Sequence, residues 1–361
     1  MRDRRHGKRG VSVVSAPYSG EAMNDTVSIV ILVKNGARYL ENLVPALAHQ
    51  IYAKEKELVV VDSGSTDGSV ELLKRLCEHH RLELNLSTVE PHEFGYGKTR
   101  NYAIQRARGD IIAVLSQDTL PLSENWLSNL LEPFADRTIA GVFGRQIPWP
   151  GTNLCEVLFY ELTYPTESRC MDLTCQASFS NLHLFFSNVN GAIRKSLALT
   201  YPYREDLIMS EDQDWACNVL DQGYSIIYEP SAAVYHSHDL ALTQLFKRYY
   251  QYGYSHRQQD LHGDVFHGGF WTAITVLRKV LLSKLWYLPY ALIFIFCQSA
   301  GFLCGRYDLL PSVLSDDLLE LKEAVVVERR SVAEYPITSL AQFRSHDGAQ
   351  ADATDPFSIR D

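Results

Sequence analysis

Residues 57–69, ELVVVDSGSTDGS, join an unbroken apolar run to a single carboxylate and a turn rich in serine and glycine. A short apolar run without alternation is typical of a strand that is buried on both faces of a parallel sheet. Ligands of such sheets bind beyond the carboxyl ends of the strands. Asp62 and Ser63 therefore lie where a ligand-binding loop is expected.

The same pattern recurs on both sides of this stretch. It is preceded by the apolar run VSIVILVKNG (27–36) and the amphipathic segment ARYLENLVPALAHQ (37–50). It is followed by VELLKRLCEHH (70–80), LELNLSTVE (82–90), TRNYAIQRAR (99–108) and GDIIAVLSQD (109–118). Strands that alternate with helices of this length predict an α/β fold built from βαβ units around a mostly parallel sheet.

Three polar groups end the apolar runs, namely Lys34–Asn35–Gly36, Asp62–Ser63–Gly64–Ser65 and Ser116–Gln117–Asp118. Because the carboxyl ends of parallel strands meet at one edge, three such groups predict a shared site. Neither GxGxxG after the first run nor GxxxxGK[ST] anywhere is present, so a nucleotide would be held by a scheme other than those two phosphate loops.

Composition limits the class of protein. The 361 residues, 46% of them hydrophobic, suffice for one large domain and an extension. The net charge of −9 argues against nucleic acid as a partner. Residues 1–25 begin with MRDRRHGKRG and predict a basic, disordered arm, with weak attraction to an anionic membrane as the alternative. Seven cysteines without a CxxC pair indicate reduced thiols in the cytoplasm.

The C-terminal third contains the apolar stretch LWYLPYALIFIFCQSAGFLCG, residues 285–305, flanked by Lys279, Lys284 and Arg306. It favours, in this order, an interfacial or hairpin-like membrane segment, a buried helix, and a membrane span. Residues 241–325 are expected to be helical, and residues 326–361 to form a disordered tail.

Five motifs occur in the order VDSGSTDGS (61–69), EFGYGKTRN (93–101), SQDTLP (116–121), SEDQDW (210–215) and VYHSH (234–238). Together they resemble the inverting glycosyltransferases of family 2, which have the GT-A fold. The resemblance covers roughly residues 27–306 and implies a GT-A domain over residues 26–240. The motifs are most similar to the rhamnosyltransferase branch, whose members typically use dTDP-rhamnose.

The resemblance implies a set of donor-binding residues: Lys34, Asn35, Asp62, Ser63, Arg100, Asn101, Gln117 and Asp118. A carboxylate at position 62 can accept the imide N–H of thymine or uracil, although an Asx turn is the alternative. A guanidinium and backbone donors at a helix start suit a diphosphate or ribose. Two positions depart from the family pattern: Ser63 replaces a second acid, and Tyr96 replaces a frequent histidine.

The resemblance also implies a site for Mg²⁺ or Mn²⁺, which would stabilise the leaving diphosphate. Asp118 corresponds to the last acid of the family's DxD motif, and Ser116 replaces the first. His236 is expected to supply the second metal ligand, and imidazole suits Mn²⁺ better than Mg²⁺. An isolated HxH segment can also be a polar loop.

An inverting transfer needs a carboxylate that takes the proton of the acceptor hydroxyl. By resemblance this base is Asp212, with Glu211 in reserve. The acceptor is expected to contact Asn188, Asn190, Trp215 and His238. A plain polar turn at 187–191 and a core position for Trp215 are the alternatives.

We therefore expect a glycosyltransferase at the cytoplasmic face of the membrane. It would move L-rhamnose from dTDP-rhamnose to a hydroxyl of a cell-surface glycan or lipid-linked saccharide. The alternatives are a UDP-hexose or UDP-HexNAc donor, a sugar nucleotidyltransferase, for which VKNGARYL is a poor phosphate loop, and a non-catalytic binding module, against which Glu211 and Asp212 argue.

Overall fold

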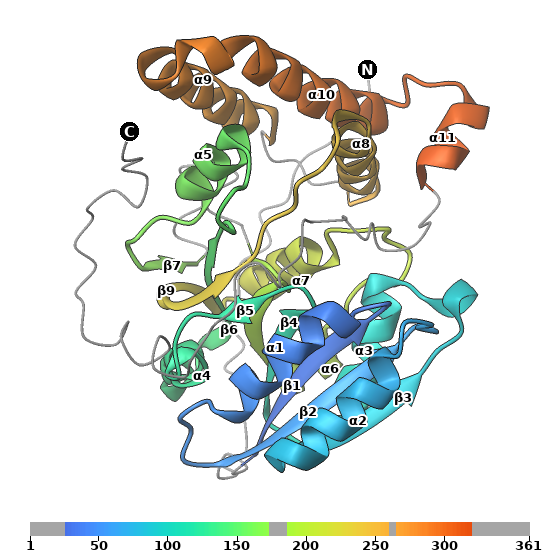
Figure 1. Ribbon diagram of the computed structural model, residues 1–361, viewed down its shortest axis with the longest axis vertical. Helices are drawn as coiled ribbons and strands as arrows, with labels where there is room; N and C mark the ends of the chain where they lie inside the picture. Colours follow the sequence, from blue (N-terminus) through green and yellow to red (C-terminus); the bar gives the residue numbers. More distant parts are fainter. Residues whose placement is uncertain (1–25, 173–185, 260–264, 320–361) are drawn as a thin grey trace, which may run out of the picture.

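The computed structural model describes residues 26–172, 186–259 and 265–319 (Figure 1). A twisted sheet with helices on both faces forms the lower part of the molecule in this view, and a layer of helices lies above it. The predicted basic arm (1–25) and C-terminal tail (326–361) lie outside the described residues.

Within the described residues the sheet has nine strands, in the order β3-β2-β1-β4-β8-β6-β9-β5, with β7 paired to β9. Strands β1, β2, β3 and β4 are mutually parallel, as expected, whereas β8 joins β4 and β6 in antiparallel fashion. The strands are β1 (Thr26–Val33), β2 (Glu55–Asp62), β3 (Glu83–Thr88), β4 (Ile111–Ser116), β5 (Leu120–Pro121), β6 (Ile139–Ile147), β7 (Arg169–Met171), β8 (Asn190–Arg194) and β9 (Ser225–Tyr235).

The apolar runs are buried on both faces of the sheet, which is why they lack alternation. In β1, Ile29 and Ile31 pack into the hydrophobic cluster beneath α1 and α2, whereas Val30 packs into the cluster on the opposite face. In β2, Val60 packs into the cluster beneath α1 and α2, and Val59 packs into the cluster on the opposite face.

Helices cover both faces of the sheet. They are α1 (Ala37–Ala48), α2 (Ser69–His80), α3 (Tyr96–Arg106), α4 (Trp126–Leu131), α5 (Leu154–Thr163), α6 (Lys195–Thr200) and α7 (Glu211–Asp221), with 3₁₀ turns η1 (Pro91–Glu93) and η2 (Glu132–Ala135). Helix α3 begins three residues earlier than Thr99, the first residue of the expected helix. Arg100 and Asn101 therefore lie in its second turn, and our prediction that they open the helix is wrong.

The upper layer consists of α8 (Leu242–Gln258), α9 (Val265–Ser283), η5 (Leu285–Tyr287), α10 (Leu288–Tyr307) and α11 (Ser312–Leu319). Among the described residues one helical stretch, Leu285–Tyr307, is long and apolar enough to cross a membrane. Only 28% of its most apolar window is buried.

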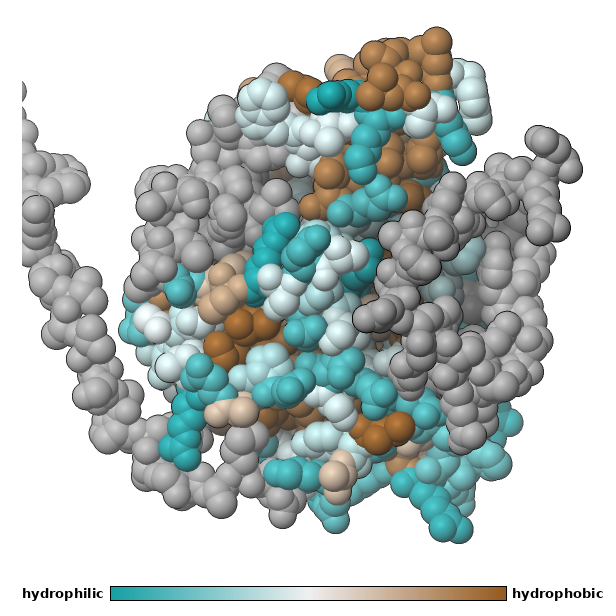
Figure 2. Space-filling view, turned by 90° about the vertical axis from the view of Figure 1, so that its left-hand side faces the viewer, coloured by the Kyte–Doolittle hydropathy of each residue, from teal (hydrophilic) through white to brown (hydrophobic). Residues whose placement is uncertain are grey.

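The exposed side of α9, η5 and α10 is apolar, and we call it the hairpin face. Figure 2 shows it as brown surface at the top of the molecule, where Figure 1 draws these helices. It comprises Trp271, Ile274, Leu281, Leu282, Leu285, Trp286, Leu292, Ile293 and Phe296, which are 37% to 76% exposed.

Helix α8 packs closely against α10 because glycines stand at their crossing. A Cβ atom added at Gly305 would collide with the carbonyl oxygen of Tyr250, and one added at Gly253 with that of Phe302. The crossing therefore brings the two backbones together and leaves no room for a side chain at these positions.

Candidate active site

The three polar groups at the strand ends meet, as their sequence positions predict. The side-chain amide of Gln117 donates to the carbonyl oxygen of Lys34 and accepts from its backbone N–H, both at 3.0 Å. Lys34 Nζ donates to the carbonyl oxygens of Ser63 (2.9 Å) and Gly64 (2.8 Å). The side chains of Gln117 and Lys34 thus hold together the loops that follow β1, β2 and β4.

Asn35 and Ser65 join the first two loops more closely. Asn35 has a positive φ of 47°, and its backbone N–H donates to Ser65 Oγ at 2.8 Å. Its side-chain oxygen accepts from the backbone N–H of Thr66 at 2.9 Å. Asn35 therefore holds the loop after β2, and its side-chain oxygen is engaged in doing so.

Asp62 forms an Asx turn, which we had considered as the alternative to binding the nucleotide base. The turn engages only one of its two carboxylate oxygens. Oδ2 accepts from the backbone N–H groups of Gly64 (2.9 Å) and Ser65 (3.0 Å). Oδ1 is buried and has no hydrogen-bond partner among the described residues. A buried acceptor without a partner is costly, so a ligand N–H is a fitting partner for Oδ1. The helix that follows does not use Asp62: its N-cap residue is Gly68, and the backbone N–H of Ser69 donates to Asp67 Oδ1 at 3.1 Å.

A cluster of possible metal ligands lies where β4 and β9 end. Asp118 Oδ2 is 3.6 Å from His236 Nε2 and 3.7 Å from His238 Nδ1. One ligand atom from each of the three residues lies within 4.8 Å of the others. This brings together the predicted ligands Asp118 and His236, and it adds His238, which we had expected to contact the acceptor.

The second nitrogen of His236 is fixed by its surroundings. Nδ1 lies 2.9 Å from Gln146 Oε1 and 3.1 Å from the hydroxyl of Tyr160. Gln146 Nε2 donates to Ser187 Oγ, so Oε1 faces the imidazole ring. An amide oxygen can only accept, which assigns the proton to Nδ1 and directs the lone pair of Nε2 toward Asp118.

These donors fit a divalent transition metal. Imidazole nitrogens with one carboxylate favour Mn²⁺ over Mg²⁺, which prefers oxygen ligands alone. Ser116 provides no carboxylate beside Asp118, and the two histidines would supply further ligands if a metal were bound. The cluster therefore contains one carboxylate and two imidazoles in place of two carboxylates. The sequence had predicted Asp118 and His236 as ligands but not His238.

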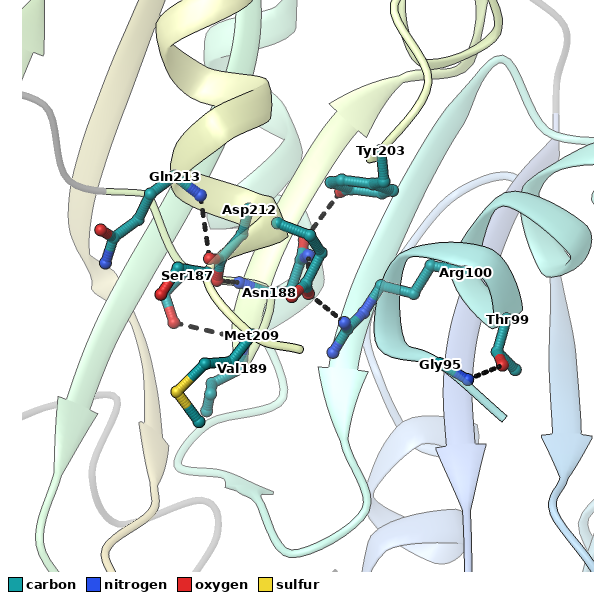
Figure 3. Close-up of polar contacts among 12 residues, drawn as sticks. Gly95, Thr99, Arg100, Ser187, Asn188, Val189, Tyr203, Met209, Asp212 and Gln213 are labelled. Carbon is teal, nitrogen blue, oxygen red and sulfur yellow. Dashed lines mark hydrogen bonds and ion pairs between the residues drawn. The ribbon is translucent and has the colours of Figure 1, made fainter. Parts of the chain in front are cut away.

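The two acids at the start of α7 have different partners (Figure 3). Glu211 Oε1 forms a buried ion pair with Arg100 and accepts from Asn188 Nδ2. Asp212 Oδ2 accepts from the backbone N–H of Asn188 at 3.0 Å, and Oδ1 accepts from that of Gln213 at 2.9 Å. Asn188 thus touches both acids, and it is buried, with 1% of its surface exposed.

The environments of the two carboxylates give them different proton affinities. Burial, followed by the negative charge of Glu211, raises the pKa of Asp212 to about 7, against the opposing effects of two backbone hydrogen bonds and Arg100. Glu211 has a guanidinium partner, and Asp212 has none among the described residues. A carboxylate with a raised pKa is the better general base near neutral pH.

Four of the residues that we predicted to bind the donor or the acceptor are engaged by the scaffold, and their binding roles stay predictions. Asn101 binds the backbone N–H and carbonyl of Tyr203. Asn188 Oδ1 accepts a hydrogen bond from the hydroxyl of Tyr203, and Asn188 also contacts both acids. Asn190 is fully buried and accepts from Trp126 Nε1. Trp215 is also fully buried and packs against aromatic rings, which was the alternative interpretation.

The segment before the acids is held by α8. Ser210 has a positive φ of 64°, uncommon for a residue with a side chain. Its carbonyl oxygen accepts from Gln259 Nε2 at 2.8 Å, and the backbone N–H of Met209 donates to Ser255 Oγ at 3.2 Å. Sequence reasoning missed these residues, as it missed Gln146, because their contacts connect distant parts of the chain.

Comparison with known proteins identifies what this chain is similar to. Residues 28–199 match the family model described as glycosyl transferase family 2. The chain is 27% identical over 288 residues to the O-antigen chain rhamnosyltransferase RfbN of Salmonella typhimurium, covering 78% of this chain and 90% of that protein. It is 28% identical over 258 residues to the O-antigen chain rhamnosyltransferase WbaN of Salmonella anatum, covering 70% of this chain and 80% of that protein.

A solved structure supports the fold. The mannosyltransferase PcManGT of Pyrobaculum calidifontis, determined in complex with GDP-Man and Mn²⁺, superposes with a TM-score of 0.57 at 18% identity. The likeness covers 82% of this chain and 92% of that one.

Proposed function

Since this chain is a family 2 glycosyltransferase with the GT-A fold, we propose that it transfers L-rhamnose from dTDP-rhamnose to a hydroxyl of a lipid-linked saccharide, with inversion at the anomeric carbon. Two observations carry the chemistry: Glu211 and Asp212 are neighbouring carboxylates with unlike partners, and Asp118, His236 and His238 form a cluster of possible metal ligands.

Asp212 is the base in this proposal. It takes the proton of the acceptor hydroxyl, whose oxygen then attacks the anomeric carbon from the face opposite the leaving diphosphate. Glu211 is engaged by Arg100 and sustains the raised pKa of Asp212 through its negative charge. Asp118, His236 and His238 would hold Mn²⁺, which supplies charge stabilisation to the leaving diphosphate.

The donor assignment is supported by the two Salmonella rhamnosyltransferases, which match most of the chain. The free Oδ1 of Asp62 is suited to the imide N–H of thymine, which uracil shares. A UDP-hexose or UDP-HexNAc donor is therefore the second candidate, because recognition of the nucleotide base by Asp62 does not discriminate between dTDP and UDP sugars.

The acceptor assignment is supported by the hairpin face. Nine large apolar side chains on α9, η5 and α10 are exposed. Arg278, Lys279 and Lys284 adjoin them in the sequence. Apolar side chains with neighbouring cations suit the surface of an anionic membrane. We propose that this face docks on the cytoplasmic leaflet, where a lipid-linked acceptor is presented.

The donor is tested with purified protein, Mn²⁺ and a panel of sugar nucleotides. We expect turnover of dTDP-rhamnose and none of UDP-glucose or UDP-GlcNAc, and Asp212→Asn should abolish transfer while dTDP still binds. Turnover of a UDP sugar alone would refute the rhamnose assignment, and full activity of Asp212→Asn would place the base elsewhere.

Membrane docking is tested by sedimentation with vesicles that contain anionic lipid. Trp286→Glu introduces a charge at a residue that is 76% exposed on the hairpin face and should reduce vesicle binding at least tenfold. Leu199→Glu, at a 50% exposed residue of α6, is the matched control and should bind as the wild type does. Equal binding of the two variants would refute docking through this face.

A further inference from the structure

Residues 187–189, which precede β8, lie between the cluster of possible metal ligands and the catalytic acids, and we call them the linking turn. Strand β8 pairs with β4, beyond which Asp118 lies, and with β6, which carries Gln146. The turn is buried, since Ser187 and Asn188 are 5% and 1% exposed. Buried polar groups need partners within the protein, and those of the linking turn come from both sides.

On the metal side, one contact runs through side chains. The Nδ1 atom of His236 lies 2.9 Å from Gln146 Oε1, and Gln146 Nε2 donates to Ser187 Oγ at 3.1 Å. A second contact runs through the backbone, where the N–H of Ser116 donates to the carbonyl oxygen of Val189 at 3.1 Å. Ser116 ends β4, the strand that leads to the carboxylate of the cluster. The linking turn is thus bonded to the elements that carry two of the three possible ligands.

On the acid side, both bonds come from Asn188 (Figure 3). Its backbone N–H donates to Asp212 Oδ2 at 3.0 Å, and its Nδ2 donates to Glu211 Oε1 at 3.3 Å. The backbone N–H of Val189 donates to Ser187 Oγ at 3.3 Å, which closes the turn on itself. A path of hydrogen bonds and backbone therefore leads from the possible metal ligands through the linking turn to both acids.

The linking turn has little room to adjust. A Cβ atom added at Gly191 would lie 2.8 Å from the carbonyl oxygen of Ser187. Asn190, directly after the turn, is fully buried and donates to the carbonyl oxygen of Ala232 at 2.8 Å. In such a closely packed setting a shift of Ser187 is passed on to Asn188 and is not absorbed by loose neighbours.

This path would respond to a cation on the cluster, because the imidazole of His236 is part of it. A positive charge at Nε2 makes the Nδ1–H group a stronger donor to Gln146. Hydrogen bonds in series polarise one another, and burial strengthens them. The hydroxyl of Ser187 is the point at which the side-chain path enters the linking turn. It also receives the Nε2 protons of Gln146, which keeps Oε1 turned toward the imidazole.

We propose that Ser187 is a positioning residue, which couples a divalent cation on the cluster to the placement of the catalytic acids. The inference rests on the proposed function, because it takes the cluster as the cation site and Asp212 as the base. With the cation present, the linking turn holds Asn188 more firmly against both acids. This coupling suits a transferase, since the base becomes fully ordered only when the metal that accompanies the donor is in place.

The test is hydrogen–deuterium exchange of the full chain, because the backbone N–H of Asn188 is itself the donor to Asp212. Exchange is measured without nucleotide, in EDTA and at the Mn²⁺ concentration that saturates a calorimetric titration. We expect Mn²⁺ to slow exchange in the linking turn of the wild type about fivefold or more, the effect of strengthening one hydrogen bond. We expect Ser187→Ala to bind Mn²⁺ and yet to show less than about a twofold change in this exchange.

Ser28→Ala is the matched control, because it also removes a buried hydroxyl with two partners. Ser28 stands near the start of β1, whereas the site lies beyond the strand ends. Its Oγ donates to Glu57 and accepts from the backbone N–H of Gly109 at 2.8 Å. This variant should lose stability and keep the Mn²⁺-dependent protection of the linking turn. Asp118→Asn should lose that protection at the concentration that saturates the wild type, which assigns the effect to the cluster.

Four results would overturn the proposal. The first is unchanged exchange of the linking turn when Mn²⁺ saturates the wild type, and the second is equal protection in the wild type and Ser187→Ala. The third is protection that persists in Asp118→Asn. The fourth is complete loss of Mn²⁺ binding in Ser187→Ala, which would make the hydroxyl part of the metal site alone.

The first of these results needs no variant, so the proposal can be refuted even if Ser187→Ala does not fold. Turnover of dTDP-rhamnose is measured separately, and each of the four results can occur while turnover persists. Failure of this inference is therefore distinguishable from failure of the proposed function.

Discussion

Glutamine at position 211 should move the pH dependence of transfer to lower pH. Glu211→Gln keeps an oxygen that can accept from Arg100 and Asn188, but it removes the negative charge next to Asp212. It also leaves the guanidinium of Arg100 without a counter-charge. Both changes favour the ionised form of Asp212, so they lower its pKa.

The size of the shift follows from the causes of the raised pKa. The pKa of Asp212 is raised to about 7, well above the ordinary value of an aspartate, with burial as the largest cause and the charge of Glu211 as the second. Burial persists in the variant, so the pKa of Asp212 falls only part of the way to its ordinary value. We expect a decrease of about 1 to 2 units, equivalent to about 1.4 to 2.7 kcal/mol.

The assay is a profile of kcat/KM for transfer between about pH 5 and 9 at saturating Mn²⁺. The base must be deprotonated, so activity rises with pH through the pKa of Asp212, and the rising limb should move to lower pH in Glu211→Gln. Asp214→Asn removes a carboxylate on the same helix, bonded to Asn218 and not to either acid, and should leave the limb in place. A limb that stays fixed or moves upward in Glu211→Gln would refute the assignment of Asp212 as the base.

Two further predictions concern the metal cluster and the helix crossing. Gln146→Leu removes the acceptor that fixes the ring of His236 and should weaken Mn²⁺ binding, measured by calorimetry, about 10- to 100-fold. Unchanged Mn²⁺ affinity in this variant would contradict the assignment of the proton to Nδ1 of His236. In the metal-stripped wild type, Mn²⁺ should restore transfer activity at a lower concentration than Mg²⁺ does. Gly305→Ala should lower the free energy of unfolding by about 1 to 3 kcal/mol in a denaturant titration, because the added methyl group meets the backbone of Tyr250. Gly269→Ala on α9, where a methyl group meets no atom within 4 Å, should cause no loss, and equal effects of the two alanines would contradict the proposed packing.

Much of the sheet could be predicted because the local sequence of each strand is a distinctive apolar run. Unbroken apolar runs fixed β1, β2 and β4 as buried strands, and their polar ends identified one edge as the site. The spacing of His236 and His238 also contained a signal that both rings share a face, but we expected only His236 to serve as a ligand. The structure places both beside Asp118.

The partners of the acids were not predictable in this way. Asn188 and Asn190 are two residues apart in one polar turn, yet the first bridges Glu211 and Asp212 and the second is buried against Trp126. The difference depends on which strand pairs with β8, and local sequence does not encode that choice. A turn rich in asparagine was therefore consistent with acceptor binding, although its side chains serve the scaffold.

The two halves of the molecule meet at the start of α7, and this explains how the C-terminal helices bear on the chemistry. From the sheet side, Asn188 holds both acids. From the helical side, Ser255 and Gln259 hold Met209 and Ser210, the residues immediately before them. The positive φ of Ser210 is maintained by these contacts, since the residue has no glycine-like freedom of its own. Because α8 is in turn packed at backbone distance on α10, the geometry of the catalytic acids depends on the same helices that carry the apolar surface.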